Sequence, residues 1–390
     1  MTYRILLALL VLVATLFVAA PVQGQSSGAP GAVYAMTNAS SGNEIVVYHR
    51  SADGLLTLAG FFATGGLGKT IEPDDALGAQ NPLILSPDNR WLFAVNAGSN
   101  TISVFQVGPS GLALLQVIAS GGDFPVSLTM NRNLLYVLNA GGDGNVTGFT
   151  VAANGLLSPL AGSTRSLNAG GTNPPFFLVS PAQVGFSPAG KWLAVTVKGI
   201  HPVHQIHIFA VDGSGLPSAQ PVTRVAANTL SFGFVFDGND RLVVTEPFGN
   251  SFNGVPGPGL SAASSYRIAA DGSLSPISSS VTNFQTATCW IAITNNTRFA
   301  YTTNNASATI SSYKVAGDGS LALLSAVAAV TGRGPVDLAI SPGGRHLYNV
   351  NAGDGTVSMY QIDQGSGALI LLGEIGGLPA DGSAVGIAVR

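Results

Sequence analysis

The stretch "AISPGGRHLYNVNAGDGTVSMYQID", Ala339 to Asp363, nearly repeats "ILSPDNRWLFAVNAGSNTISVFQVG", Ile84 to Gly108. Each copy holds an apolar strand end, a turn of the S-P-D-G-R type, a strand ending in Asn, a loop of small residues and another strand. A D-G turn and a last apolar strand complete the unit. Pro, Asp, Asn and Gly supply the fixed or positive φ that tight turns need, and the alternation between them suits half-buried strands. The unit therefore predicts four strands.

Copies of the unit fill the chain and begin near Pro82, Pro125, Pro181, Thr229, Thr286 and Pro335, the first and last of which contain the two quoted stretches. An N-terminal copy at residues 31–58 lacks its first strand, and "AVGIAVR", Ala384 to Arg390, resembles that missing strand but has no unit after it. Pairing the two would close a ring and remove exposed sheet edges. We therefore predict an all-β, seven-bladed β-propeller, closed by its C-terminal strand, with residues 25–390 as a single domain.

One position repeats at the end of the second strand of every blade. It is occupied by Asn38, Asn96, Asn139, Val197, Glu246, Asn304 and Asn351. A short amide tolerates left-handed backbone and bonds nearby backbone groups, so this column is interpreted as turn chemistry, with ligand contact as the alternative. Glu246 breaks the column and is the first candidate for a functional acid. The alternative is a solvated or Arg-paired loop carboxylate.

The composition restricts the classes of partner. Charged residues make up 9% of the 390, against about 25% in ordinary globular proteins, and the net charge is −3 without a Lys/Arg cluster. Nucleic acid is therefore not expected as a partner, because binding it requires several phosphates to be neutralised together. The single cysteine, Cys289, has no partner for an internal disulfide, and its apolar strand favours a core position.

The N-terminus has the features of a secretory signal. Residues 1–24 contain Arg4, an unbroken apolar run from Ile5 to Ala20, and small residues spaced for cleavage. The run is shorter than the roughly 20 residues that cross a bilayer, which favours a cleaved signal over an uncleaved anchor. We expect a secreted or periplasmic protein without stable membrane insertion after cleavage.

With its S-P-x-G-R/K, L-Y-V-x-N-x-G and T-I-S-x-Y patterns, the chain resembles the seven-bladed lactonase-like propellers, which include 6-phosphogluconolactonase and the fungal carboxymuconate cyclases. The resemblance implies a lactone site where first strands begin and second strands end, with His and Arg groups and a Glu that serves as base. Here "RLVVTEPFG" keeps the acid as Glu246. Ala182, Leu230, Ser231 and Asn305 stand where the family carries cationic or ring groups.

Polar residues at the same face are candidate ligand contacts. They are Lys198, Gln183, Gln80, Asn81, Arg333 and Asp337. Lys198 lies one position past Val197, in the blade before Glu246, and a Lys beside a Glu suits an acidic or hydroxylated ligand. The alternative is a solvated loop end. The long loop Gly65 to Pro82, which contains Gln80 and Asn81, is expected to form a lid over the channel mouth.

No cofactor or metal is expected. His201, His204 and His207 are spaced by three, so in a strand of about 3.3 Å per residue the outer two lie roughly 20 Å apart and the middle one faces away. Glu72, Asp74 and Asp75 leave Ca²⁺ binding open as an unspecific alternative.

Two hypotheses for the function stay open. In the first, an exported propeller binds a small polar ligand or sugar lactone at the channel mouth and hydrolyses it, with Glu246 activating water. In the second, the same face binds a protein, glycan or small molecule without catalysis, as the missing His and Arg groups favour. The sequence does not fix the oligomeric state.

Overall fold

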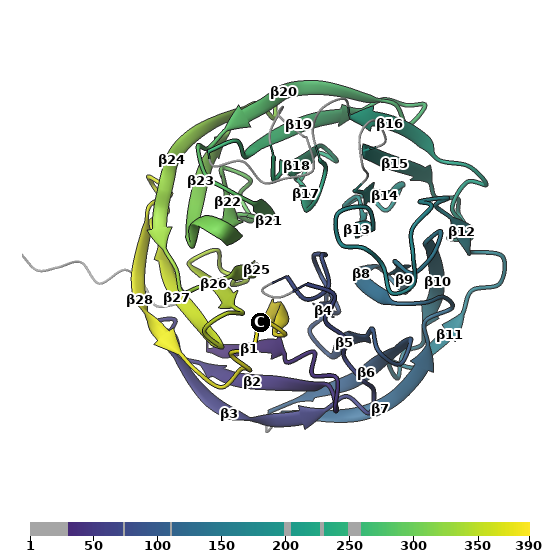
Figure 1. Ribbon diagram of the computed structural model, residues 1–390, viewed down its shortest axis with the longest axis horizontal. Helices are drawn as coiled ribbons and strands as arrows, with labels where there is room; N and C mark the ends of the chain where they lie inside the picture. Colours follow the sequence, from purple (N-terminus) through teal and green to yellow (C-terminus); the bar gives the residue numbers. More distant parts are fainter. Residues whose placement is uncertain (1–29, 73–74, 110, 199–203, 227–229, 249–258) are drawn as a thin grey trace, which may run out of the picture.

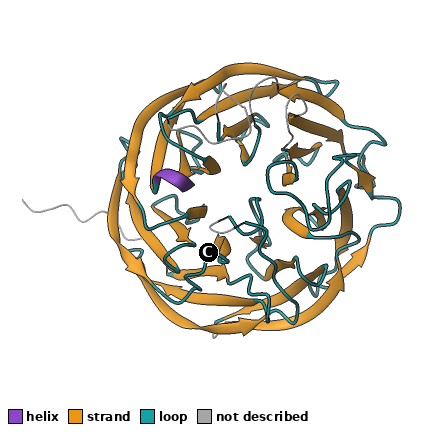
Figure 2. Cartoon of the chain, in the orientation of Figure 1, coloured by secondary structure: helices purple, strands orange, loops and turns teal. Residues whose placement is uncertain are grey.

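The computed structural model describes residues 30–390 except 73–74, 110, 199–203, 227–229 and 249–258. The predicted signal at residues 1–24, together with His201 and Asp74, lies outside these residues. The described strands form seven sheets around a ring, six of four strands and one of five (Figure 1). Figure 2 shows strands in every sector, and the 3-10 helix η1 (Asn305–Ser307) is the one helical element of the described chain.

The strands of the first four blades, each given from the channel outward, have the following bounds. The first is β29 (Val385–Val389), β1 (Gly31–Met36), β2 (Glu44–Arg50) and β3 (Leu56–Ala63). The second is β4 (Leu83–Leu85), β5 (Trp91–Asn96), β6 (Thr101–Gly108) and β7 (Gly111–Ala119). The third is β8 (Pro125–Asn131), β9 (Leu134–Asn139), β10 (Asn145–Val151), β11 (Leu157–Pro159) and β12 (Arg165–Ser166). The fourth is β13 (Pro181–Phe186), β14 (Trp192–Val197), β15 (His204–Ala210) and β16 (Val222–Ala226).

Three further blades complete the ring. The fifth is β17 (Phe234–Phe236), β18 (Leu242–Glu246), β19 (Ala262–Ile268) and β20 (Leu274–Thr282). The sixth is β21 (Thr288–Ile293), β22 (Phe299–Asn304), β23 (Thr309–Val315) and β24 (Leu321–Val330). The seventh is β25 (Pro335–Ile340), β26 (His346–Asn351), β27 (Thr356–Ile362) and β28 (Leu369–Ile375). The predicted seven-bladed β-propeller is therefore confirmed.

The ring closes through the C-terminal strand, as predicted. β29 pairs antiparallel with β1, with Val389 opposite Val33. The Arg50 guanidinium reinforces this closure, because its Nε and Nη2 both donate to the Arg390 carbonyl, at 3.2 and 3.0 Å. The two ends of the described chain are thus held in one sheet, in which β29 covers the inner edge of β1.

The Asn column performs turn chemistry, as interpreted. Asn96 Nδ2 donates to Thr101 Oγ1 and Ser103 Oγ at 3.1 and 2.8 Å, which ties the end of one strand to the start of the next. Asn304 and Asn351 make the same pair of hydrogen bonds in their own blades. All three side chains are fully buried, so each bond satisfies an amide that burial would otherwise penalise.

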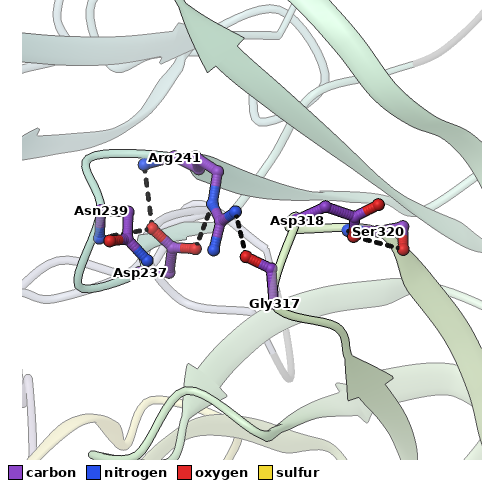
Figure 3. Close-up of polar contacts among 6 residues, drawn as sticks. All are labelled: Asp237, Asn239, Arg241, Gly317, Asp318 and Ser320. Atoms are coloured by element: carbon purple, nitrogen blue, oxygen red, sulfur yellow. Dashed lines mark hydrogen bonds and ion pairs between the residues drawn. The ribbon is translucent and has the colours of Figure 1, made fainter.

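At three junctions between neighbouring blades, a buried tyrosine reaches across to the next blade's outer hairpin. Tyr136, Tyr301 and Tyr348 donate to the carbonyls of Gly215, Gly367 and Gly54 at 2.7, 2.8 and 2.9 Å. In the fifth blade the equivalent position is Val243, which cannot donate. There Arg241 makes the connection instead: its Nε pairs with Asp237 Oδ2 at 2.6 Å and its Nη1 donates to the Gly317 carbonyl of the sixth blade at 2.8 Å (Figure 3).

Across the residues that the structure describes, none of the helical structure has the length and apolar character needed to cross a membrane.

Candidate functional site

The loop before β4 enters the centre of the ring (Figure 1). We call its segment Ala76–Asn81 the channel plug. Ala76, Leu77 and Ala79 are fully buried, and the Ala79 carbonyl accepts a hydrogen bond from Trp290 Nε1 at 2.9 Å. The plug therefore lies among the innermost strands, whereas the sequence predicted a lid over the mouth.

The polar groups at the end of the plug, Gln80 and Asn81, form hydrogen bonds with neighbouring blades. Gln80 Nε2 donates to the Ile291 carbonyl at 2.8 Å, and the Ile291 amide donates back to Gln80 Oε1 at 3.1 Å. The Gln80 backbone N–H also donates to the carbonyl of Ala182. The Asn81 amide donates to Asp337 Oδ2 at 3.1 Å. The plug is thus fastened to three different blades.

A cavity of about 180 Å³ lies between the part of the loop that precedes the plug, Glu72 and Asp75, and the strand ends of the fourth, fifth and sixth blades. Its lining is mostly apolar and aromatic, with a few polar groups: Glu72, Asp75, Phe177, Leu178, Lys198, Leu230, Phe232, Pro247, Phe248, Ala287, Cys289, Asn305 and Ala306. We call it the mouth pocket. An apolar hollow with a few convergent charged groups is the usual form of a small-molecule site.

Lys198 lies at the inner wall of the mouth pocket. Its side chain is 1% exposed, its Nζ donates to the Gly78 carbonyl of the plug at 2.5 Å, and it sits 4.8 Å from the centre of the Phe232 ring. Burial lowers the pKa of Lys198 to about 8, although the nearby charge of Asp75 acts in the opposite direction. Near neutral pH this ammonium is therefore held by one carbonyl and one aromatic face.

Asp75 supplies the opposite charge. Its Oδ1 is buried without a hydrogen-bond partner among the described residues. Burial raises the pKa of Asp75 to about 6, and the Lys198 ammonium limits this rise. A carboxylate and an ammonium whose pKa values lie on either side of 7 can exchange protons with a substrate at neutral pH. Cys289, on the same wall, is buried as predicted, and burial raises the pKa of its thiol well above its usual value.

Glu246 does not line the mouth pocket, although Pro247 and Phe248 do. As a member of the Asn column it points into its own blade, where its Oε1 and Oε2 accept from Ser264 Oγ and Ser280 Oγ at 2.6 and 2.7 Å. The side chain is 1% exposed, and burial raises the pKa of the carboxyl. The catalytic role predicted for Glu246 stays a prediction.

The structure brings Gln80, Asn81 and Gln183 together, away from Lys198. Gln183 Nε2 donates to the Phe234 carbonyl at 2.9 Å, and the Phe234 amide donates to Gln183 Oε1 at 2.6 Å, so this amide bridges two blades as Gln80 does. All three line a separate cavity of about 410 Å³ toward the far ends of the innermost strands.

The last two predicted ligand contacts line neither cavity. Asp337 is buried against Asn81, while Arg333 is 75% exposed at its side chain and pairs with Asp354 at 2.7 Å. The ligand-binding roles predicted for Gln80, Asn81, Gln183, Asp337 and Arg333 stay predictions.

Within the described ranges, no group of three or more His, Cys, Asp or Glu side chains is arranged to hold a metal ion. His204 and His207 both lie in β15 and are buried, and His207 Nδ1 contacts Thr223 Oγ1 at 2.8 Å. Burial lowers the pKa of His207 to about 4. Sequence reasoning treated Asp75 only as a possible calcium ligand. The apolar "ALGA" that follows Asp75 was the available signal that this part of the loop is buried.

The comparisons with known proteins agree with this architecture. The family model described as lactonase, seven-bladed β-propeller, matches residues 70–170 and 264–383. None of the curated proteins matches the chain. A protein from Bacteroides uniformis, provisionally assigned as a 6-phosphogluconolactonase, superposes with a TM-score of 0.69 at 18% identity, covering 93% of this chain and 99% of that one.

Two further solved structures show how far the fold extends. The periplasmic gluconolactonase of Pseudomonas aeruginosa gives a TM-score of 0.67 at 19% identity, covering 92% of this chain and 99% of its own. Hydrazine synthase of Kuenenia stuttgartiensis gives 0.59 at 16% identity, covering 84% and 94%. At these identities the likeness concerns the fold alone, which proteins of different chemistry share.

Proposed function

Because the chain belongs to the lactonase seven-bladed β-propeller family, we propose that it is an exported enzyme that hydrolyses a small, uncharged lactone in the mouth pocket. The observation that carries this proposal is the placement of Asp75 and Lys198 in one apolar-walled cavity. Lactone hydrolysis needs a base for water and a cation or donor for the oxyanion, and these two residues provide both.

In the proposed reaction, Asp75 takes a proton from water as the water oxygen attacks the lactone carbonyl carbon. The negative charge that develops on the carbonyl oxygen is stabilised by the Lys198 ammonium, in a pocket where low dielectric strengthens the interaction. The C–O bond of the ring then breaks, the leaving oxygen receives the proton held by Asp75, and the product is an open-chain hydroxy acid. Glu72 lies at the same wall and adds negative charge there.

The size and charge of the mouth pocket favour a substrate without a phosphate. Its volume of about 180 Å³ is below the ~300–1,000 Å³ usual for drug-sized ligands. Two carboxylates face one ammonium among its lining residues, and no Arg is present there to bind a phosphate in bidentate fashion. A phosphorylated or carboxylated lactone would meet more repulsion than attraction.

A propeller that binds without catalysis is the second candidate. It is favoured by the internal hydrogen bonds of Gln80, Gln183 and Glu246, which leave few groups turned toward a substrate. In that case the mouth pocket would hold a small ligand between Lys198 and Asp75 without turnover.

The test is a pH-stat assay of the purified protein against neutral and phosphorylated sugar lactones, with Asp75→Asn, Lys198→Met and the exposed control Lys314→Met beside it. We expect acid release from neutral lactones, a loss of about 10²-fold or more in both pocket variants, and wild-type rates in the control. Saturable lactone binding without acid release would favour the binding propeller. Cleavage after Gly24, measured by the mass of the protein exported from its host, tests the signal.

A further inference from the structure

Lys198 differs from every other lysine of the chain. The sequence contains four, and Lys69, Lys191 and Lys314 are all exposed, whereas Lys198 is 1% exposed. The ion pairs of the described chain join Arg90, Arg241 and Arg333 to Asp residues, and none of them includes Lys198. Its nitrogen is held by the Gly78 carbonyl, and the residue lines the mouth pocket.

A buried lysine beside an apolar cavity can act as a nucleophile. An apolar pocket disfavours the ammonium and so supplies the neutral amine, which is the nucleophile in imine formation. The Gly78 carbonyl accepts one N–H and fixes the direction of the nitrogen, while the Phe232 ring covers one side. The remaining approach is from the mouth pocket, where a ligand would lie.

We propose that Lys198 captures small, uncharged aldehydes and ketones in the mouth pocket as a reversible imine. The amine nitrogen adds to the carbonyl carbon and gives a carbinolamine after a proton moves from nitrogen to oxygen. The Asp75 carboxylate then takes the remaining N–H proton and passes it to the carbinolamine hydroxyl, which leaves as water, and the nitrogen and carbon are left joined by the double bond of the neutral imine. One water is released for each imine, and no oxidant or reductant takes part.

The lining of the pocket defines which carbonyl compounds fit. Phe177, Leu178 and Leu230 offer apolar contact to a short alkyl chain, and the volume of about 180 Å³ limits its length. Glu72 and Asp75 lie at the same cavity and repel carboxylates, so a keto acid is disfavoured against a neutral ketone or aldehyde of equal size.

This reaction is separate from the proposed hydrolysis, although both use one pocket. Hydrolysis needs the ammonium form of Lys198, whereas imine formation needs the neutral amine, and burial lowers the pKa of this group to about 8, where both forms are populated. A bound aldehyde would therefore inhibit lactone hydrolysis, but imine formation does not depend on the hydrolysis being real.

The experiment is reductive trapping on the full-length folded protein. The protein is incubated at pH 8 with limiting propanal and sodium cyanoborohydride, and alkylation at each of the four lysines is measured by peptide mass spectrometry. We expect Lys198 to be labelled at least about tenfold faster than Lys69, Lys191 and Lys314, because a lowered pKa leaves far more neutral amine. Pyruvate in place of propanal should label Lys198 much less.

Two variants distinguish labelling at Lys198 from an effect of misfolding. Lys198→Met should keep the wild-type circular dichroism and lose the fast labelling phase, and Lys314→Met should keep that phase. Equal rates at all four lysines, or fast labelling that persists in Lys198→Met, would overturn the proposal. Lactone hydrolysis is assayed on the same samples: labelling of Lys198 in a protein without hydrolase activity would contradict the proposed function alone.

Discussion

The backbone N–H of Asn81 donates to Asp337 Oδ2 at 3.1 Å, so a carboxyl from the seventh blade fastens the channel plug. Burial raises the pKa of Asp337 from 3.8 to about 8, with the charge of Asp75 adding to the rise. Between these two values the folded protein binds more protons than the unfolded chain, so the stability contributed by Asp337 is lost as the pH rises from about 4 to about 8.

Asp337→Asn should therefore flatten the pH dependence of stability. The amide keeps an acceptor oxygen for the Asn81 N–H but carries no charge at any pH. We expect the variant to match wild type near pH 4 and to exceed it at pH 8 by on the order of 1–3 kcal/mol in the free energy of unfolding, measured by urea denaturation across that range. If Asp337→Asn were less stable than wild type at pH 8, the raised pKa of Asp337 in the folded protein would be contradicted.

The pair of groups in the mouth pocket predicts a bell-shaped pH profile. Asp75 acts as base once it is deprotonated, above about pH 6, and Lys198 stabilises the oxyanion while it is protonated, below about pH 8. We expect kcat/KM for a neutral lactone to be greatest near pH 7, with limbs near 6 and 8. Lys198→Arg should retain part of the activity and move the alkaline limb upward, because a guanidinium stays charged. A profile that does not fall between pH 7.5 and 9.5 would remove Lys198 from the mechanism.

The strand and turn pattern of the sequence was sufficient to predict the fold, because the information is local and repeated. Asn96, Asn304 and Asn351 each bond residues five and seven positions away, so one blade contains both partners of the contact. The unpaired C-terminal strand added the one long-range constraint that a ring requires. The blade count and the closing pair followed from these features.

The site was less predictable, because its contacts join distant parts of the chain. The plug meets the sixth blade through Ala79 and Trp290, 211 residues apart, and no periodic pattern encodes that meeting. The register placed Glu246 correctly at a strand end, but its direction depends on Ser264 and Ser280, which attract the carboxylate into the blade. The repeat fixes where a residue lies along its strand, whereas the direction of its side chain depends on the side chains around it.

Glu246→Gln tests the base that the sequence favoured against the base that the pocket favours. If Glu246 serves as a buried acceptor for Ser264 and Ser280, the amide oxygen keeps one of these bonds and kcat/KM should fall by less than about threefold. Asp75→Asn should lower kcat/KM by about 10²-fold or more in the same assay. The reverse order, with equal thermal stability of both variants, would identify Glu246 as the base.

A buried ion pair within the fifth blade positions the Arg241 guanidinium that reaches the sixth blade, and its loss should be costly. Arg241 and Asp237 have side chains 11% and 1% exposed, and the guanidinium also reaches the Gly317 carbonyl (Figure 3). Arg241→Met leaves the Asp237 carboxylate buried without its cation, which costs about 3–5 kcal/mol in such pairs. Arg241→Met combined with Asp237→Asn removes that charge and should recover part of the loss.

The matched control is Arg333→Met, which breaks an ion pair of nearly the same length at the surface. The Arg333 and Asp354 side chains are 75% and 34% exposed, so water and salt already screen the pair, and its loss should cost at most about 1 kcal/mol. Urea denaturation of the three variants and wild type measures both costs on one scale. Equal losses for Arg241→Met and Arg333→Met would mean that sheet packing and the other contacts with the sixth blade hold the fifth blade without Arg241. A much larger loss of stability in Arg241→Met than in Arg333→Met would show that burial makes the Arg241–Asp237 pair important in the blade that has Val243 in place of a tyrosine.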